Sequence, residues 1–336
     1  MAEFCRIRRP GGGRRPANEN IFDLDETFLL VIQDHIAGDP MNEDIKWLKL
    51  TNYEIRMLLK KHGVVVGKNV VRNLLKKHKF AKRKMERKKS TGEFKDRDLQ
   101  FRNIAKIKKE FQEAGNPILS IDTKKKEDLG DLARDGRAYT TKAIQAYDHD
   151  YPHLSEGKLV PHGIYDLARN EALITLGMQN ETAQFISDAL KKWWDTIGQR
   201  YYPTATSILV LCDAGGANSY RHHAFKFALQ ALANKIGMPI RICHYPPYAS
   251  KWNPIEHRVF PHVTRTMEGV PLKSISEAKD LIKKTTTKTG LNVVVKTSKK
   301  VYQTGIKVAK TALEKINITK HGKLKQLNYT IAPAVM

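Results

Sequence analysis

The sequence has 336 residues, of which 41% are hydrophobic, so the chain can bury a sizeable core. Lys and Arg number 59 against 35 Asp and Glu, which gives a formal net charge of +24 at pH 7. A positive field of this size favours polyanions, and no apolar run approaches the roughly 18 to 20 residues of a membrane-spanning helix. We therefore expect nucleic acid, not a membrane, as the partner. Three cysteines without CxxC spacing argue against a disulfide scaffold and fit a reducing interior.

Residues 1–20 consist largely of Gly, Pro and Arg, which predicts a basic, flexible arm. Such an arm fits the narrow, negative minor groove of A·T-rich DNA. A disordered terminus without a ligand is the alternative. The arginines that we expect to contact DNA are Arg8, Arg9, Arg14 and Arg15.

Residues 21–90 are expected to form a helix-turn-helix DNA-binding region. Apolar residues recur at helical spacing over 21–36, Thr51 with Glu54 predicts a capping box for the next helix, and a Gly-containing turn precedes another at 69–80. Residues 68–89 hold 11 Lys or Arg against one acid, and this run begins in the second helix of the pair. DNA contact is therefore predicted, with an ordinary helical hairpin as the alternative. The expected contacts are Lys68, Arg72, Lys76, Lys77, Lys82, Arg83 and Lys84.

A connecting helix is predicted over 91–116, and the pattern changes at Pro117. Short apolar runs predict strands at 118–122, 138–150, 172–178, 207–213 and 239–245. Helical stripes predict helices at 181–198, at 219–237 and from Asn253, where Pro254 is tolerated in the first turn. This β-β-β-α-β-α-β-α order predicts an α/β domain over 117–270, an RNase H-like mixed sheet flanked by helices. Residues 271–336 are predicted to be a basic C-terminal extension with a helix, a short strand and another helix.

Three carboxylates occupy positions where an α/β sheet places its ligands. Asp122 and Asp213 each follow an apolar strand directly, and Glu256 lies in the first turn of a predicted helix. Carboxylates at two strand ends and one helix can hold a pair of Mg²⁺ ions, which prefer oxygen ligands and act in pairs about 3.5–4 Å apart. An Asp that ends a strand is more often a cap than a ligand, so the residues alone leave both roles open.

Several side chains near these carboxylates are candidates for contacts with DNA. Lys124 is expected to hold a phosphate, with a solvated hairpin edge as the alternative, and Lys251 and Arg258 are placed to do the same. Asn253 is expected to cap its helix more than to orient substrate. Trp252 lies in a proline-rich loop, where stiffening of the loop is favoured slightly over stacking on an unpaired base.

Motifs of one family occur in order over residues 117–333, namely SIDTKKKE, PHGIYD, DAGGANSYR, CHYPPYASKWNPIEHR and NYTIAP. Together they resemble the Rhodopirellula-type DDE transposase family of bacterial insertion sequences, which is related to the mariner-like group. The resemblance implies an RNase H-like domain that cuts and joins DNA, with Asp122, Asp213 and Glu256 as catalytic and metal-holding residues. It also implies two Mg²⁺ ions that Mn²⁺ can replace, and double-stranded DNA partners, namely the element ends and the target. The resemblance further implies a homodimer or higher oligomer on the DNA, and a location at the nucleoid in the bacterial cytoplasm.

The sequence also departs from the family pattern. Family members carry a longer N-terminal region, whereas this chain starts within the segment RIRRPGGGR, so we expect a fragment, a truncated gene copy or a misassigned start. A truncated or non-catalytic DNA-binding protein derived from a transposase is therefore one alternative. A nuclease that cleaves without joining is another. No member of the carboxylate triad is substituted, which favours an active enzyme.

Overall fold

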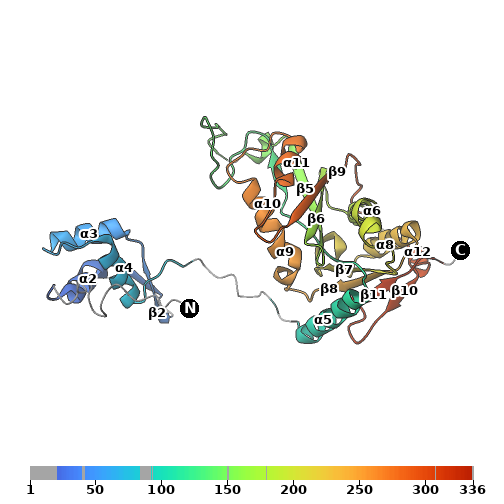
Figure 1. Cartoon of the computed structure of the whole chain (residues 1–336), viewed down its shortest axis with the longest axis horizontal. Helices are drawn as coiled ribbons and strands as arrows, with labels where there is room; N and C mark the ends of the chain where they lie inside the picture. Colours follow the sequence, from blue (N-terminus) through green and yellow to red (C-terminus); the bar gives the residue numbers. More distant parts are fainter. Residues whose placement is uncertain are drawn as a thin grey trace, which may run out of the picture. The chain divides into compact units, whose positions relative to one another are not determined.

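The computed structural model describes residues 21–39, 42–83, 92, 94–149, 151–178, 180–306 and 308–334. The chain consists of two compact units, Met1–Lys88 and Lys89–Met336 (Figure 1). Each unit has its own hydrophobic core. The predicted basic arm of residues 1–20, with Arg8, Arg9, Arg14 and Arg15, and also Lys84, lie outside the described residues.

The first unit contains the three helices that the sequence predicts. They are α2 (Leu24–Gln33), α3 (Asn52–Lys61) and α4 (Lys68–Lys77). The predicted capping box is confirmed, because the Thr51 Oγ1 accepts a hydrogen bond from the Glu54 N–H at 3.2 Å and the Glu54 carboxylate accepts one from the Thr51 N–H at 2.6 Å. Apolar side chains of all three helices pack together in one cluster around Phe28, Ile55 and Val71.

An antiparallel hairpin joins α2 to α3, which the sequence analysis missed. It consists of β1 (Ile36–Asp39) and β2 (Asn42–Leu48), and Ile36 pairs with Leu48. Ile45 and Trp47 of β2 are 41% and 51% exposed. Because neither face of this hairpin is fully buried, it lacks the continuous or alternating apolar pattern by which a strand is predicted.

The second unit is built on a mixed sheet, nine-stranded in the part of the chain that the structure describes. Its order is β10-β11-β8-β7-β3-β5-β6-β9, and β4 pairs with β5 off this path. The strands are β3 (Ile118–Thr123), β4 (Glu127–Leu129), β5 (Gly157–Asp166), β6 (Glu171–Met178), β7 (Ile208–Cys212), β8 (Ile240–His244), β9 (Asn292–Thr297), β10 (Ile318–Lys320) and β11 (Asn328–Ile331).

The five central strands have the arrangement of the RNase H-like fold. β3 lies between β5, which runs antiparallel to it, and β7, which runs parallel to it. β6 pairs antiparallel outside β5, and β8 pairs parallel outside β7. The predicted mixed α/β fold is therefore confirmed, because the two crossovers from β6 to β7 and from β7 to β8 each contain a helix.

Helices cover both faces of this sheet (Figure 1). The side chains of α6 (Ala183–Trp193) and α8 (His223–Ile236) pack on one face with Leu119 and Ile121 of β3. The other face packs against α5 (Arg97–Glu113), α9 (Pro254–Arg258), α10 (Phe260–Thr266) and α11 (Ile275–Lys283). The structure also contains a π-helical turn, η2 (Trp194–Gly198), the short α7 (Gln199–Tyr201) and α12 (Lys310–Glu314). None of the helices within the described ranges is long and apolar enough to cross a bilayer.

The second strand of the sheet is not the one that the sequence predicts. The prediction of a strand at 138–150 is wrong, because the described residues 138–149 form no strand and have exposed side chains. The strand that pairs antiparallel with β3 is instead β5, which contains Pro161 and the buried His162. A proline removes a donor from the hydrogen-bond ladder, and an interior proline therefore argues against a central strand in a sequence.

The C-terminal residues complete both edges of the sheet. The predicted helix, strand and helix are confirmed as α11, β9 and α12. β9 extends the sheet in parallel beyond β6, whereas β11 and then β10 extend it beyond β8. The sequence analysis missed β10 and β11, whose three and four residues are too short for a periodic pattern.

Candidate active site

The sheet and α9 bring Asp122, Asp213 and Glu256 to one place. β3 and β7 are parallel neighbours, so their carboxyl ends lie at the same edge, where Asp122 occupies the fifth position of β3 and Asp213 follows β7. Glu256 lies in the first turn of α9. The carboxyl groups of Asp122 and Glu256 are within hydrogen-bonding reach of each other, the charge of Asp213 acts on Asp122, and the charge of Glu256 acts on Asp213.

A buried bridge fixes the start of α9 to β3. Asn253 is fully buried, and its Nδ2 donates to the Ile121 carbonyl at 2.9 Å while its Oδ1 accepts from the Ser120 hydroxyl. The Ser120 Oγ in turn accepts from the Ile255 N–H at 3.0 Å. Asn253 does stand at the N-cap of α9, but its side chain makes no capping hydrogen bond, so the expected capping role is wrong. The side chain instead holds Glu256 in register with Asp122.

A second buried network holds the backbone that carries Asp213. The His244 Nδ1 lies 2.9 Å from the Asp213 carbonyl oxygen, and its Nε2 lies 3.1 Å from the Tyr329 hydroxyl. Burial lowers the pKa of His244 to about 4. The ring is therefore neutral at pH 7, with its Nδ1–H donating to the carbonyl and its Nε2 accepting from Tyr329. Tyr329 lies on β11, so an unpredicted strand helps to position a predicted site residue.

The carboxyl groups oppose one another's ionisation. Burial, a hydrogen bond with Glu256 and the charge of Asp213 raise the pKa of Asp122 to about 9, although the Thr123 N–H donates to it at 2.8 Å. Burial and the charges of Glu181 and Glu256 raise the pKa of Asp213 to about 6. The surrounding side chains therefore supply too little positive charge to balance these carboxyl groups when they are ionised.

Glu181 is a fourth carboxylate at this edge, and the sequence analysis missed it. Burial raises its pKa, against a hydrogen bond with Thr123 and the charge of Lys126. It follows β6, which runs in the same direction as β3 because both pair antiparallel with β5. The rule that parallel strands share a carboxyl edge would have identified it, had β5 been placed correctly.

The donor set suits a hard divalent cation. All four groups offer carboxylate oxygens, which Mg²⁺ prefers, and a cation would offset the repulsion that helps to raise the pKa values of Asp122 and Asp213. Across the described ranges, no three His, Cys, Asp or Glu side chains are gathered closely enough to hold one ion by themselves. Mg²⁺ is commonly held by one or two carboxylates together with water and substrate phosphates.

The predicted DNA-contacting residues of the first unit lie in different surroundings. The side chains of Lys68, Arg72, Lys76, Lys82 and Arg83 are exposed. Lys77 forms an ion pair with Asp25, whose other oxygen lies 2.9 Å from the His78 Nε2. Lys77 therefore ties the end of α4 to α2, whereas the five exposed cations stay available to a ligand.

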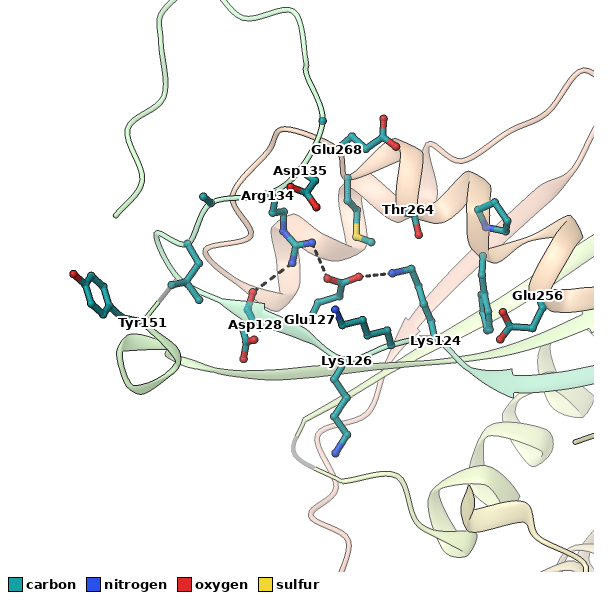
Figure 2. A pocket seen from close by; sticks show the side chains of 17 residues that line it. Lys124, Lys126, Glu127, Asp128, Arg134, Asp135, Tyr151, Glu256, Thr264 and Glu268 are labelled. Atoms are coloured by element: carbon teal, nitrogen blue, oxygen red, sulfur yellow. Dashed lines mark hydrogen bonds and ion pairs between the residues drawn. The ribbon is translucent and has the colours of Figure 1, made fainter. Parts of the chain in front are cut away.

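In the second unit, Lys251 and Arg258 are exposed, and the Lys251 ammonium lies 5.8 Å from the centre of the Trp252 ring. Trp252 is 53% exposed and meets Phe101 edge-on, with 6.0 Å between ring centres. Lys124 is not at a solvated hairpin edge. It is buried beside Glu127 and lines a cavity of about 660 Å³ that Glu256 also lines (Figure 2).

Comparison with known proteins gives one strong match and several weak ones. The Mos1 transposase paired-end complex with left transposon end is 13% identical with a TM-score of 0.40, over 76% of this chain and 68% of that chain. The mariner Mos1 paired end complex with Mg is 14% identical with a TM-score of 0.40, over 82% and 73%. No curated protein matches. The family described as Rhodopirellula transposase DDE domain matches residues 27–333. This chain therefore belongs to the Rhodopirellula transposase DDE domain family.

Proposed function

We propose that this protein is the DDE transposase of an insertion sequence, which cleaves DNA at the element ends and joins it to a target. Asp122, Asp213 and Glu256 are the proposed catalytic residues, and they would hold two Mg²⁺ ions, or Mn²⁺. One observation carries the proposal. In a chain of a transposase family, three carboxyl groups from β3, the end of β7 and α9 come together, and their mutual proximity helps to raise the pKa values of Asp122 and Asp213.

The chemistry divides between the ions and the protein. When bound, the ions would stabilise charge on the attacking and leaving oxygens of the phosphodiester. The protein supplies the oxygen ligands and holds them in place, Glu256 through Asn253 and Asp213 through His244. Positioning and charge neutralisation then carry most of the catalysis. No ATP is needed, because the energy of the broken phosphodiester is retained in the new one.

The proposed partner is double-stranded DNA at the element ends and the target. The net charge of +24 favours a polyanion, and exposed cations of α4 (Lys68, Arg72 and Lys76) occupy the second helix of the proposed helix-turn-helix. Two element ends must be held together for transposition. We therefore propose a homodimer or higher oligomer on the DNA, acting at the bacterial nucleoid.

A cleavage and joining assay with the element's own ends tests the proposal. Purified protein with Mg²⁺ or Mn²⁺ should nick and join the DNA, and Asp213→Asn should abolish both products. Asp195→Asn removes an exposed carboxylate on η2 and serves as the matched control, with activity expected to stay unchanged. Cleavage without joining would favour a nuclease. Tight binding without cleavage would favour a non-catalytic DNA-binding protein derived from a transposase.

A further inference from the structure

A triad of charged side chains lies in the segment that follows β3. Lys124 comes two residues after Asp122 and is 8% exposed, and both Glu127 and Arg134 are 15% exposed. The Glu127 Oε1 accepts a hydrogen bond from the Lys124 ammonium, and its Oε2 accepts one from the Arg134 Nη1 at 2.8 Å. Figure 2 shows Glu127 between these two cations and Lys126 directed away from them. We call these three residues the Lys124 triad.

The Lys124 triad lines the same cavity as Glu256. The cavity has a volume of about 660 Å³, which falls within the usual range for ligand pockets, roughly 300–1,000 Å³. Phe260 and Thr264 of α10 also line the cavity. A ligand in this cavity would therefore contact the triad while it lay beside a proposed catalytic carboxylate.

The charge balance of the triad leaves it able to take up an anion. A buried lysine is costly unless it is paired, and here one carboxylate serves two cations, so the triad itself carries a net positive charge. The same cavity is also lined by the cations Lys125 and Lys126 and by the carboxylates Asp128, Asp135, Glu256 and Glu268. Burial raises the pKa of Glu127, but hydrogen bonds and charges from Lys124 and Arg134 outweigh burial and hold it below the usual value. Glu127 thus stays ionised at pH 7 and remains bound to both cations.

The donors of the triad match a phosphate better than they match a single carboxylate. Arg presents up to five N–H donors in a planar fork that suits phosphate oxygens, and Lys presents three. One Arg134 nitrogen is bound to Glu127, and the Nη2 makes only a long contact of 3.4 Å with the Asp128 carbonyl. Glu127 therefore takes the position that a phosphate oxygen would take between the same two cations.

We propose that the Lys124 triad is a subsite for a phosphate of the bound DNA strand, with Glu127 as a resident counter-ion that limits how tightly the strand is held. The inference rests on the proposed function for the identity of the strand. Binding at this subsite needs no catalysis, because it depends on charge and donor geometry alone. A purely structural ion triad would not respond to the charge of the DNA, and this separates the two interpretations.

Glu127→Gln tests the counter-ion role, because glutamine keeps the size of the side chain and removes its charge. Binding of fluorescent end DNA to the full-length chain is measured by anisotropy in EDTA over a series of salt concentrations. At about 0.1 M salt, Glu127→Gln should bind DNA roughly 3- to 10-fold more tightly than the wild type. The slope of log affinity against log salt concentration should steepen by the amount expected for about one additional phosphate contact. Asp195→Asn makes the same charge change away from the cavity and should stay within about twofold of the wild type. Equal affinities for these two variants would overturn the proposal.

Arg134→Gln provides a second test that does not depend on the stability of Glu127→Gln. It should weaken end binding several-fold and reduce the salt dependence by about one phosphate equivalent. DNA in which single phosphates near the cleavage point are replaced by neutral methylphosphonates then locates the contact. One replacement should weaken wild-type binding several-fold and leave Arg134→Gln binding unchanged. If every replacement weakens both proteins equally, the subsite does not exist.

These binding measurements separate this inference from the proposed function. They are made without a divalent ion, so no cleavage interferes. A protein that responds to Glu127→Gln and Arg134→Gln but never cleaves DNA would refute the transposase activity and leave the subsite standing. If the protein cleaves and joins DNA, but all these variants bind DNA with the same affinity, the subsite is refuted and the transposase activity stands.

Discussion

Asp213→Asn should make the metal-free protein more stable, even though it removes a proposed catalytic residue. Burial and the charges of Glu181 and Glu256 raise the pKa of Asp213 from 3.8 to about 6. At 1.36 kcal/mol per pH unit, the ionised group costs the folded state roughly 3 kcal/mol at neutral pH. Partial access to solvent reduces this cost, so Asp213→Asn should raise the free energy of unfolding by about 1–2 kcal/mol. That change corresponds to a rise of about 3–6 °C in the Tm of the second unit.

The sign of the pH dependence follows from the raised pKa. In the wild type, the stability contributed by Asp213 is present below its unfolded pKa and is lost as the pH rises through about 6. The difference in the free energy of unfolding between Asp213→Asn and the wild type should therefore grow between about pH 4 and pH 6 and stay constant above that range. Mg²⁺ should raise the Tm of the wild type, because it binds only the folded state, and should have little effect on the variant.

Differential scanning calorimetry in EDTA and in excess Mg²⁺, over a pH series, measures both effects. Asp195→Asn is the control, since its exposed carboxylate should show neither the gain in Tm nor the loss of the metal effect. The reasoning is refuted if Asp213→Asn is less stable than the wild type in EDTA at neutral pH. Equal stabilisation of both proteins by Mg²⁺ would refute the assignment of Asp213 as a metal ligand.

Four further changes test the site and the fold. Because burial, Glu256 and Asp213 raise the pKa of Asp122 to about 9, Mg²⁺ must displace its proton, and calorimetry should show the apparent metal affinity rising up to tenfold per pH unit between about pH 7 and pH 9. Asn253→Ala breaks the bridge between α9 and β3 and should slow cleavage at least about tenfold with end binding unchanged. Tyr248 has a left-handed φ of 62°, so Tyr248→Gly should raise the free energy of unfolding by about 0.5–1 kcal/mol in denaturant melts. Thr51→Ala removes the cap of α3 and should destabilise the first unit by about 1 kcal/mol, measured by hydrogen exchange of its amides.

Each of these predictions has a contrary outcome. A metal affinity independent of pH would mean that Asp122 is already ionised in the free protein. Normal cleavage by Asn253→Ala would show that the bridge does not position Glu256. Lys79 also has a left-handed φ of 62°, so Lys79→Gly is the matched control for Tyr248→Gly. If only Tyr248→Gly fails to stabilise, the contacts of the tyrosine ring outweigh its backbone strain. Unchanged exchange in Thr51→Ala would indicate that packing alone holds α3.

Local patterns in the sequence were sufficient for much of the fold. The stripe of Ile186, Leu190 and Trp193 predicts the buried face of α6, and the Thr51–Glu54 pair predicts the start of α3. Both features depend on residues within about one or two helical turns of each other, so their physical cause is contained in a short segment. The apolar runs that end at Asp122 and Asp213 are local in the same sense, and they predicted β3 and β7.

Only the tertiary structure decided which segments become neighbours. β5 contains a proline and a buried histidine, and it is a strand because β3 and β6 flank it on both sides. The gathering of Glu181, Arg134 and Tyr329 near the candidate site likewise depends on pairings between segments far apart in the chain. The sequence by itself determined most helices, the strands β3, β6, β7, β8 and β9, and the candidate carboxylates, because periodicity and spacing are short-range properties. The edge at which the carboxylates meet, and the pKa values that result, arise from long-range packing and burial, which no short segment encodes.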